Sequence, residues 1–160
     1  MTKIRTSGIA GFTFIELVVC TAVMMILASA ALPIVRISIR RQREADLHRT
    51  LREVRAAIDK FKNYADSNQI ASADLQFGSE GYPASLEQLV EGVPIANDAS
   101  GRKWKFLRRI PLDPLTGKAE WGMRSYQDDP KSMVWGGQNV YDIYSKVDGV
   151  GLDGTKYRDW

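Results

Sequence analysis

Hydrophobic residues form an almost unbroken run from Phe12 to Val35, and a regular mixture of apolar and charged positions follows it. The run is 24 residues long, and about 20 apolar residues suffice for a helix to cross a bilayer. Beyond it, apolar residues recur at alternating spacings of four and three, the period of one helix face: Leu47, Leu51, Val54, Ile58, Phe61 and Ala65. No Gly or Pro follows Val35 before Gly78. We therefore predict one long helix with an apolar stem, 12–35, and an amphipathic half, 36–66.

Residues 67–160 carry shorter patterns that predict a small globular domain. Ser85-Leu86-Glu87-Gln88 has the form of a capping box, so a short helix is expected over 85–91. Alternating or aromatic-rich stretches at Ala119–Gln127 and Asn139–Lys146 are typical of strands. Together these elements predict an α+β fold, in which one long helix packs on a small antiparallel sheet with a C-terminal loop.

Charge is unevenly distributed along the chain. The formal net charge is only +3, but the segment from Arg36 to Lys62 holds nine basic residues and four acidic ones. Such a cluster beside an apolar stem is typical of a solvated collar at phospholipid headgroups. Aromatic residues do not alternate with these charges, as they do in binders of single-stranded nucleic acid. We therefore expect membrane lipid, and no nucleic acid, as a partner.

The chain offers little material for catalysis. Its only histidine, His48, lies in the charged half of the predicted helix, and its only cysteine, Cys20, lies in the stem. No glycine-rich phosphate loop and no His–Cys metal spacing occurs. The adjacent carboxylates of Asp128 and Asp129 fall in a turn rather than across a cleft. We expect that the protein is not an enzyme, and a single cysteine excludes an intrachain disulfide.

A carboxylate interrupts the apolar run near its start. Glu16 follows Gly11 by five residues, and a charged side chain near the centre of a spanning helix costs about 2.5–3.5 kcal/mol. Cleavage between Gly11 and Phe12 would create an ammonium group close to Glu16 of the same copy or of a neighbouring one. Such a cleavage would supply the opposite charge that this carboxylate needs.

Other processing schemes explain this segment less fully. Ala28-Ser29-Ala30 before Ala31 has the form of a signal peptidase site, but cleavage there gives no reason for Glu16 in the apolar core. A lipoprotein cut before Cys20 is disfavoured because Val19 is larger than the small residue expected at that position. A plain single-span anchor leaves the carboxylate without a partner.

The segment Gly11-Phe12-Thr13-Phe14-Ile15-Glu16 resembles the processing site of type IV pilins and of the pseudopilins of type II secretion. Pro33 lies where pilin-like proteins have a proline. Two later segments, Pro111–Pro114 and Tyr141–Ser145, and the Asp-Gly loop after them are similar to the major (G-type) pseudopilin. The resemblance implies a pilin-like fold and removal of a leader, residues 1–11. It further implies that Phe12 is N-methylated and that Glu16 guides filament assembly.

The resemblance also implies a structural function. The chain would be a subunit of a type II secretion pseudopilus that is cut by a prepilin peptidase and polymerises with itself. Minor pseudopilins and an inner-membrane assembly platform would be its other partners. The precursor would span the bacterial inner membrane once, and the assembled periplasmic filament would support protein export across the outer membrane. A type IV pilus subunit for adhesion, motility or DNA uptake is the alternative, and a secreted calcium-binding module is a third.

Three carboxylates lie in the glycine-rich C-terminal loop, those of Asp148, Asp153 and Asp159. Oxygen ligands on a flexible loop suit calcium, which takes six to eight of them. The resemblance implies a structural calcium ion held by Asp148, with Ser145 and the Lys146 backbone nearby. The family has further acidic ligands that this chain does not match one for one. We assign Asp153 and Asp159 to that role in their place. Asx turns and caps made by the same aspartates remain the open alternative.

Overall fold

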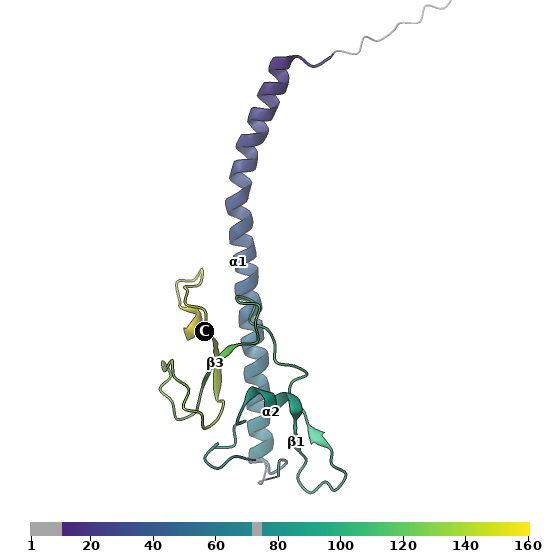
Figure 1. The fold of residues 1–160 in the computed structure, drawn as a ribbon, viewed down its shortest axis with the longest axis vertical. Helices are drawn as coiled ribbons and strands as arrows, with labels where there is room; N and C mark the ends of the chain where they lie inside the picture. The colour runs from purple at the N-terminus through teal and green to yellow at the C-terminus, as the bar shows by residue number, and fades with distance from the viewer. Residues whose placement is uncertain (1–10, 72–74) are drawn as a thin grey trace, which may run out of the picture. The chain divides into compact units, whose positions relative to one another are not determined.

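The computed structural model describes residues 11–71 and 75–160, without the side chains of residues 30–34, and shows an α+β chain (Figure 1). The chain divides into two compact units, Met1–Arg40 and Arg41–Trp160. The fold combines a long helix with small antiparallel sheets, and the sequence predicted the long helix and the antiparallel strands. The predicted leader, 1–11, lies almost wholly outside the described residues.

The longest element, α1, extends over Phe14–Asp66. Its second half has the predicted buried face. All six residues of the apolar stripe are at most 7% exposed: Leu47, Leu51, Val54, Ile58, Phe61 and Ala65. Charged side chains occupy most other positions, so this half is an amphipathic helix that lies on its own globular unit.

The end of α1 is fixed by a Schellman motif. The Gln69 N–H donates to the Tyr64 carbonyl at 2.9 Å, and the Asn68 N–H donates to the Ala65 carbonyl at 3.0 Å. Asn68 has a φ of 54°, a left-handed conformation that asparagine adopts more readily than most residues. The helix therefore stops because its last carbonyls are satisfied by a turn rather than by a further helical residue.

The short helix α2, Leu86–Glu91, begins with the predicted cap. The Ser85 side chain accepts a hydrogen bond from the Gln88 N–H at 3.4 Å. In return, Gln88 Oε1 accepts from the Ala84 N–H at 2.8 Å. The two bonds satisfy backbone donors that the first turn of a helix leaves free.

Four short strands form two separate two-stranded antiparallel sheets among the described residues, where the sequence predicted one sheet. The strands are β1 (Val93–Pro94) paired with β2 (Lys103–Trp104), and β3 (Trp121–Arg124) paired with β4 (Asp142–Ser145). The second pair lies inside the predicted strands but is shorter. The first pair was not predicted, because two residues are too few to show an alternating pattern.

The early end of β3 has a local cause. Beyond Arg124, the backbone N–H groups donate to side chains instead of to β4. The Ser125 N–H donates to Asp128 Oδ2 at 2.7 Å. The Tyr126 N–H donates to Asn139 Oδ1 at 3.0 Å. The chain therefore leaves the ladder and forms the loop that connects β3 to β4.

The core of the globular unit lies on the buried face of α1. Buried apolar residues from later parts of the chain cluster with that face: Ile70, Leu86, Leu89, Val93, Leu107, Trp121, Val140, Ile143 and Tyr157. Burial of each large aliphatic or aromatic side chain contributes about 1.5–3 kcal/mol. A polar bridge supplements the apolar contacts, because Arg55 Nε on α1 donates to Asp142 Oδ1 on β4 at 2.7 Å. The amphipathic half of α1 is thus the scaffold of this unit.

Candidate functional site

Thr13 caps the N-terminal end of α1. Its carbonyl accepts from the Leu17 N–H at 3.2 Å, and its Oγ1 accepts from the Glu16 N–H at 3.3 Å. Glu16 is therefore the third residue of the helix, and Thr13 to Glu16 matches the capping-box pattern. A carboxylate in the first turn also suits the helix dipole. This role was not predicted from the sequence, although the same pattern predicted the cap at Ser85.

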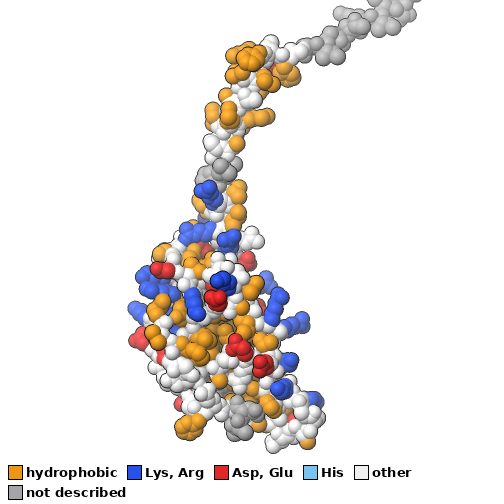
Figure 2. Space-filling model, viewed as in Figure 1, with side chains coloured by type: hydrophobic (Ala, Val, Ile, Leu, Met, Phe, Trp, Pro, Cys, Tyr) orange, Lys and Arg blue, Asp and Glu red, His pale blue; other side chains and the backbone are white. Residues whose placement is uncertain are grey.

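Exposed apolar side chains surround Glu16. Phe12 is 80% exposed and Phe14 is 83% exposed. The remaining large apolar residues of the described stem are also exposed: Ile15, Leu17, Val18, Val19, Val23, Met24, Met25, Ile26, Leu27 and Val35. Several of them are consecutive, so they cover every face of the helix. Figure 2 shows orange side chains of this segment on the face in view. Helix capping explains a glutamate here, but it does not explain this apolar surface.

The exposed apolar surface of this helix is unusual for a soluble monomer. Soluble monomers rarely expose contiguous apolar patches larger than a few hundred Å², and each large side chain that becomes covered gains about 1.5–3 kcal/mol. The part of the chain that the structure describes has no helix that meets the length and apolarity of a membrane span. The predicted stem, 12–35, includes residues 30–34, whose side chains are outside that part.

Basic side chains follow the stem. Arg36, Arg41 and Arg43 are exposed on α1, and Figure 2 shows blue side chains where the apolar segment ends. These residues belong to the predicted collar at phospholipid headgroups, which stays a prediction. Long basic side chains can place their charge at a headgroup layer while their stems cover apolar surface.

The predicted calcium ligands differ in their exposure to solvent. The side chains of Lys146, Asp148 and Asp159 are exposed, whereas Ser145 is buried. Ser145 Oγ donates to the fully buried Asp113 Oδ2 at 2.6 Å. This bond ties the Asp-Pro turn to the end of β4, so the hydroxyl has a protein partner.

Asp153 forms an Asx turn. Its Oδ1 accepts from the Thr155 N–H at 2.9 Å and from Thr155 Oγ1 at 2.7 Å. The backbone hydrogen bond from Thr155, more than any other contact, lowers the pKa of the Asp153 carboxyl below its ordinary value. The alternative that the sequence left open, turn formation, is therefore confirmed at this residue.

The carboxylates of Asp148, Asp153 and Asp159 do not gather into one cluster in the described part of the chain. Within residues 11–71 and 75–160, no three His, Cys, Asp or Glu side chains gather closely enough to hold a metal ion. Calcium needs six or more converging oxygens. Calcium binding by Asp148, Asp153 and Asp159 stays a prediction from the sequence.

Glu44, which anchors the C-terminal loop on α1, was also not predicted from the sequence. Glu44 on α1 is only 7% exposed. Its carboxylate accepts from the Leu152 N–H, at 3.2 Å from each oxygen, and from the Tyr157 hydroxyl at 2.8 Å. The spacing along the helix could have indicated this buried position. Glu44 precedes Leu47 by three residues and so lies on the same helix face as the apolar stripe. A charged residue on such a face needs a buried partner.

Comparison with known protein families, with curated proteins and with solved structures finds no match to this chain. The functional conclusion therefore depends on the residues and on their arrangement.

Proposed function

We propose that the protein is a structural subunit of a type II secretion pseudopilus, cut between Gly11 and Phe12 and assembled into a filament through its apolar stem. The observation that carries the proposal is the stem itself, which exposes large apolar side chains on all faces and has Glu16 in its first turn. Lipid of the inner membrane would cover this surface in the precursor. Stems of other copies would cover it in the filament.

Glu16 gives the assembly its register under this proposal. A carboxylate among packed stems is removed from water, and it needs an opposite charge. Cleavage by a prepilin peptidase supplies that charge as the terminal ammonium of Phe12 on a neighbouring copy. Loss of one partner from a buried pair costs about 3–5 kcal/mol. An assembly platform in the inner membrane and minor pseudopilins would complete the machinery.

Helix capping is the competing explanation of Glu16, and two variants separate it from assembly. Glu16→Gln retains a residue type that serves at the third helix position but removes the charge. Thr13→Ala retains the charge but removes the cap, at a cost of about 0.5–2 kcal/mol. We expect Glu16→Gln and Glu16→Ala to insert and to be processed without forming filaments, and Thr13→Ala to form them.

The measurement is made in cells that contain the peptidase and the platform. Filaments are sheared from the cells, sedimented and quantified by immunoblot, and the mobility of the membrane-bound chain reports processing. Normal filament yield from Glu16→Gln and Glu16→Ala would show that the charge has no part in assembly and would refute the proposed role.

A further inference from the structure

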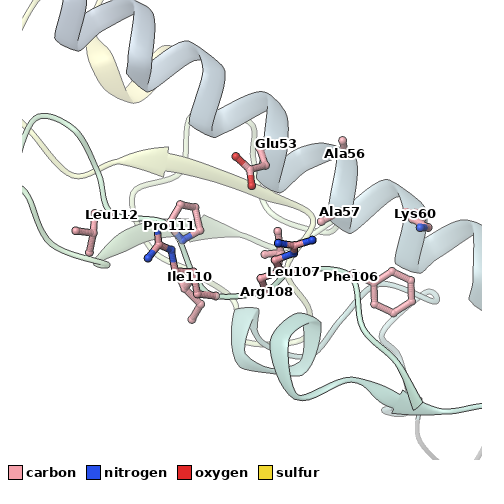
Figure 3. A pocket seen from close by; sticks show the side chains of 11 residues that line it. Glu53, Ala56, Ala57, Lys60, Phe106, Leu107, Arg108, Ile110, Pro111 and Leu112 are labelled. Atoms are coloured by element: carbon pink, nitrogen blue, oxygen red, sulfur yellow. The ribbon is translucent and has the colours of Figure 1, made fainter. Parts of the chain in front are cut away.

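A groove runs between α1 and the segment 106–112. Its volume is about 1120 Å³. One wall consists of Glu53, Ala56, Ala57 and Lys60 on α1, and the segment 106–112 forms the facing wall, as the close-up in Figure 3 shows. That segment is held in place from below, because the Leu89 carbonyl of α2 accepts from the N–H groups of both Phe106 and Leu107 at 2.9 Å. The groove is therefore a formed feature of the globular unit.

The groove combines an apolar surface with a basic rim. Most of its lining is alanine, leucine, isoleucine, proline and phenylalanine, and Leu112 at one end is 59% exposed. The charged lining residues are Lys60, Arg108 and Arg109 against the single acid Glu53. A smaller adjoining pocket of about 470 Å³ adds Lys105. Arg108 and Arg109 make no ion pair with any carboxylate of the described residues, so the groove suits an occupant that is apolar and negatively charged.

The loop 126–134, between β3 and β4, has the complementary properties. It exposes large side chains, with Tyr126 at 57%, Met133 at 55% and Val134 at 76%. It also carries the carboxylates of Asp128 and Asp129 against the single basic side chain of Lys131, so acidic residues outnumber basic ones in the loop. The loop is held by its own hydrogen bonds: Asp128 Oδ2 accepts from the Ser125 N–H at 2.7 Å and from the Gly136 N–H at 3.0 Å. A loop already held in shape loses little conformational entropy when it binds.

We infer that the loop 126–134 of one copy occupies the groove between α1 and the segment 106–112 of the next copy. The groove and the loop share no residue, and Figure 1 shows the loop with β3 on one side of α1 and the segment 106–112 on the other. One copy can therefore donate its loop and receive another at the same time. Such a head-to-tail contact continues without closing and builds an open helical assembly. The inference rests on the proposed filament function and names a contact between globular units that adds to the contact between stems.

Disulfide trapping in the full-length chain tests the inference. Cys20, the only cysteine, is first replaced by serine. Ala56→Cys then places a thiol in the groove, and Val134→Cys places one in the loop. Copies carrying one substitution each are co-expressed in the assembling cells and oxidised with copper phenanthroline. We expect a disulfide-linked dimer from the mixture and a ladder of higher oligomers when both cysteines are in one chain. Ala99→Cys, exposed and outside the groove, replaces Val134→Cys as the matched control and should give no dimer above background.

Charge reversal tests the fit of the two surfaces. Arg108→Asp in the copy that carries Ala56→Cys should lower the disulfide yield by about two- to fivefold. This factor corresponds to the loss of one exposed ion pair. Asp129→Arg in the copy that carries Val134→Cys should restore the disulfide yield. Equal yields from the Val134→Cys and Ala99→Cys mixtures would overturn the inference. Protection of Ala56→Cys from a water-soluble maleimide by phosphatidylglycerol vesicles, without a link to residue 134, would place a lipid surface in the groove and would also overturn it.

Sedimentation of filaments from the same cells separates this inference from the proposed function. Filaments without the 56–134 disulfide would refute the loop-in-groove contact and leave the function standing. The disulfide without filaments would support the contact and count against the function.

Discussion

Glu44 is one of the residues of α1 that hold the C-terminal loop. Its buried carboxylate accepts two donors from that loop, those of Leu152 and Tyr157. One turn further along the helix, the His48 ring stacks on Trp160 with their centroids 4.1 Å apart. The loop is thus attached at two successive turns of the same helix by contacts that do not require a metal ion.

Removal of the Glu44 carboxylate should destabilise the globular unit. Glu44→Ala leaves the buried donors of Leu152 and Tyr157 without their partner, so we expect a loss of about 1–3 kcal/mol in the free energy of unfolding. Tyr157→Phe removes only one donor and should cost about 0.5–1.5 kcal/mol. Urea unfolding of the detergent-solubilised chain, followed by tryptophan fluorescence, measures both. The exposed Glu53→Ala is the control on the same helix, and an equal effect from it would contradict the anchor role.

At the scale of elements, α1 has two halves with opposite surroundings. Leu51 in the second half is 1% exposed, and Leu27 in the first half is 66% exposed. The same residue type on one helix therefore serves two purposes: it fills the core of the globular unit in one half and forms an uncovered surface in the other.

This contrast predicts a clean separation of effects. Leu51→Ala should lower the free energy of unfolding of the globular unit by about 2–5 kcal/mol, because it leaves a cavity in a packed core. Leu27→Ala should leave that free energy unchanged and reduce the yield of sedimented filaments. Denaturant unfolding and filament sedimentation on both variants give the comparison. Filament yield unaffected by Leu27→Ala and by further alanine substitutions in the stem would mean that the stem is not the assembly surface.

Much of this element structure could be predicted from the sequence. The period of Leu47 to Ala65 predicted the buried face of α1, and the Ser85 pattern predicted the cap of α2, because both depend on local spacing. The two sheets, the partner of Glu44 and the groove beside Arg108 could not be predicted. Each depends on contacts between segments far apart in the chain, for which local spacing carries no signal. Thr13 and Glu16 were an exception, since their capping pattern was local and was overlooked.

Calcium binding by the C-terminal loop is a further prediction at this scale. If Asp148 and its neighbours bind calcium, the ion binds the folded state and raises the thermal midpoint of unfolding relative to a sample with chelator. Asp148→Asn should abolish that shift. Thermal melts of the detergent-solubilised chain with calcium and with chelator provide the measurement. Coincident melts would indicate that the hydrogen bonds of Asp153 and Glu44 hold the loop without an ion.

The chain contains a globular unit with its own hydrophobic core and a stem, 12–35, whose described part has no hydrophobic core. The globular unit buries its apolar stripe with its own residues, whereas the described part of the stem leaves its apolar side chains exposed. Assembly through the stem would bury that exposed apolar surface against the stems of other copies. The loop 126–134 and the groove would then join the globular units of successive copies.

The central claim is that the mature chain begins at Phe12 and retains the stem for assembly. The most direct test is the intact mass and N-terminal sequence of the protein purified from its native membrane. We expect a chain that starts at Phe12 and carries one added methyl group. A chain that starts at Ala31 would lack both the stem and Glu16, and it would contradict the account.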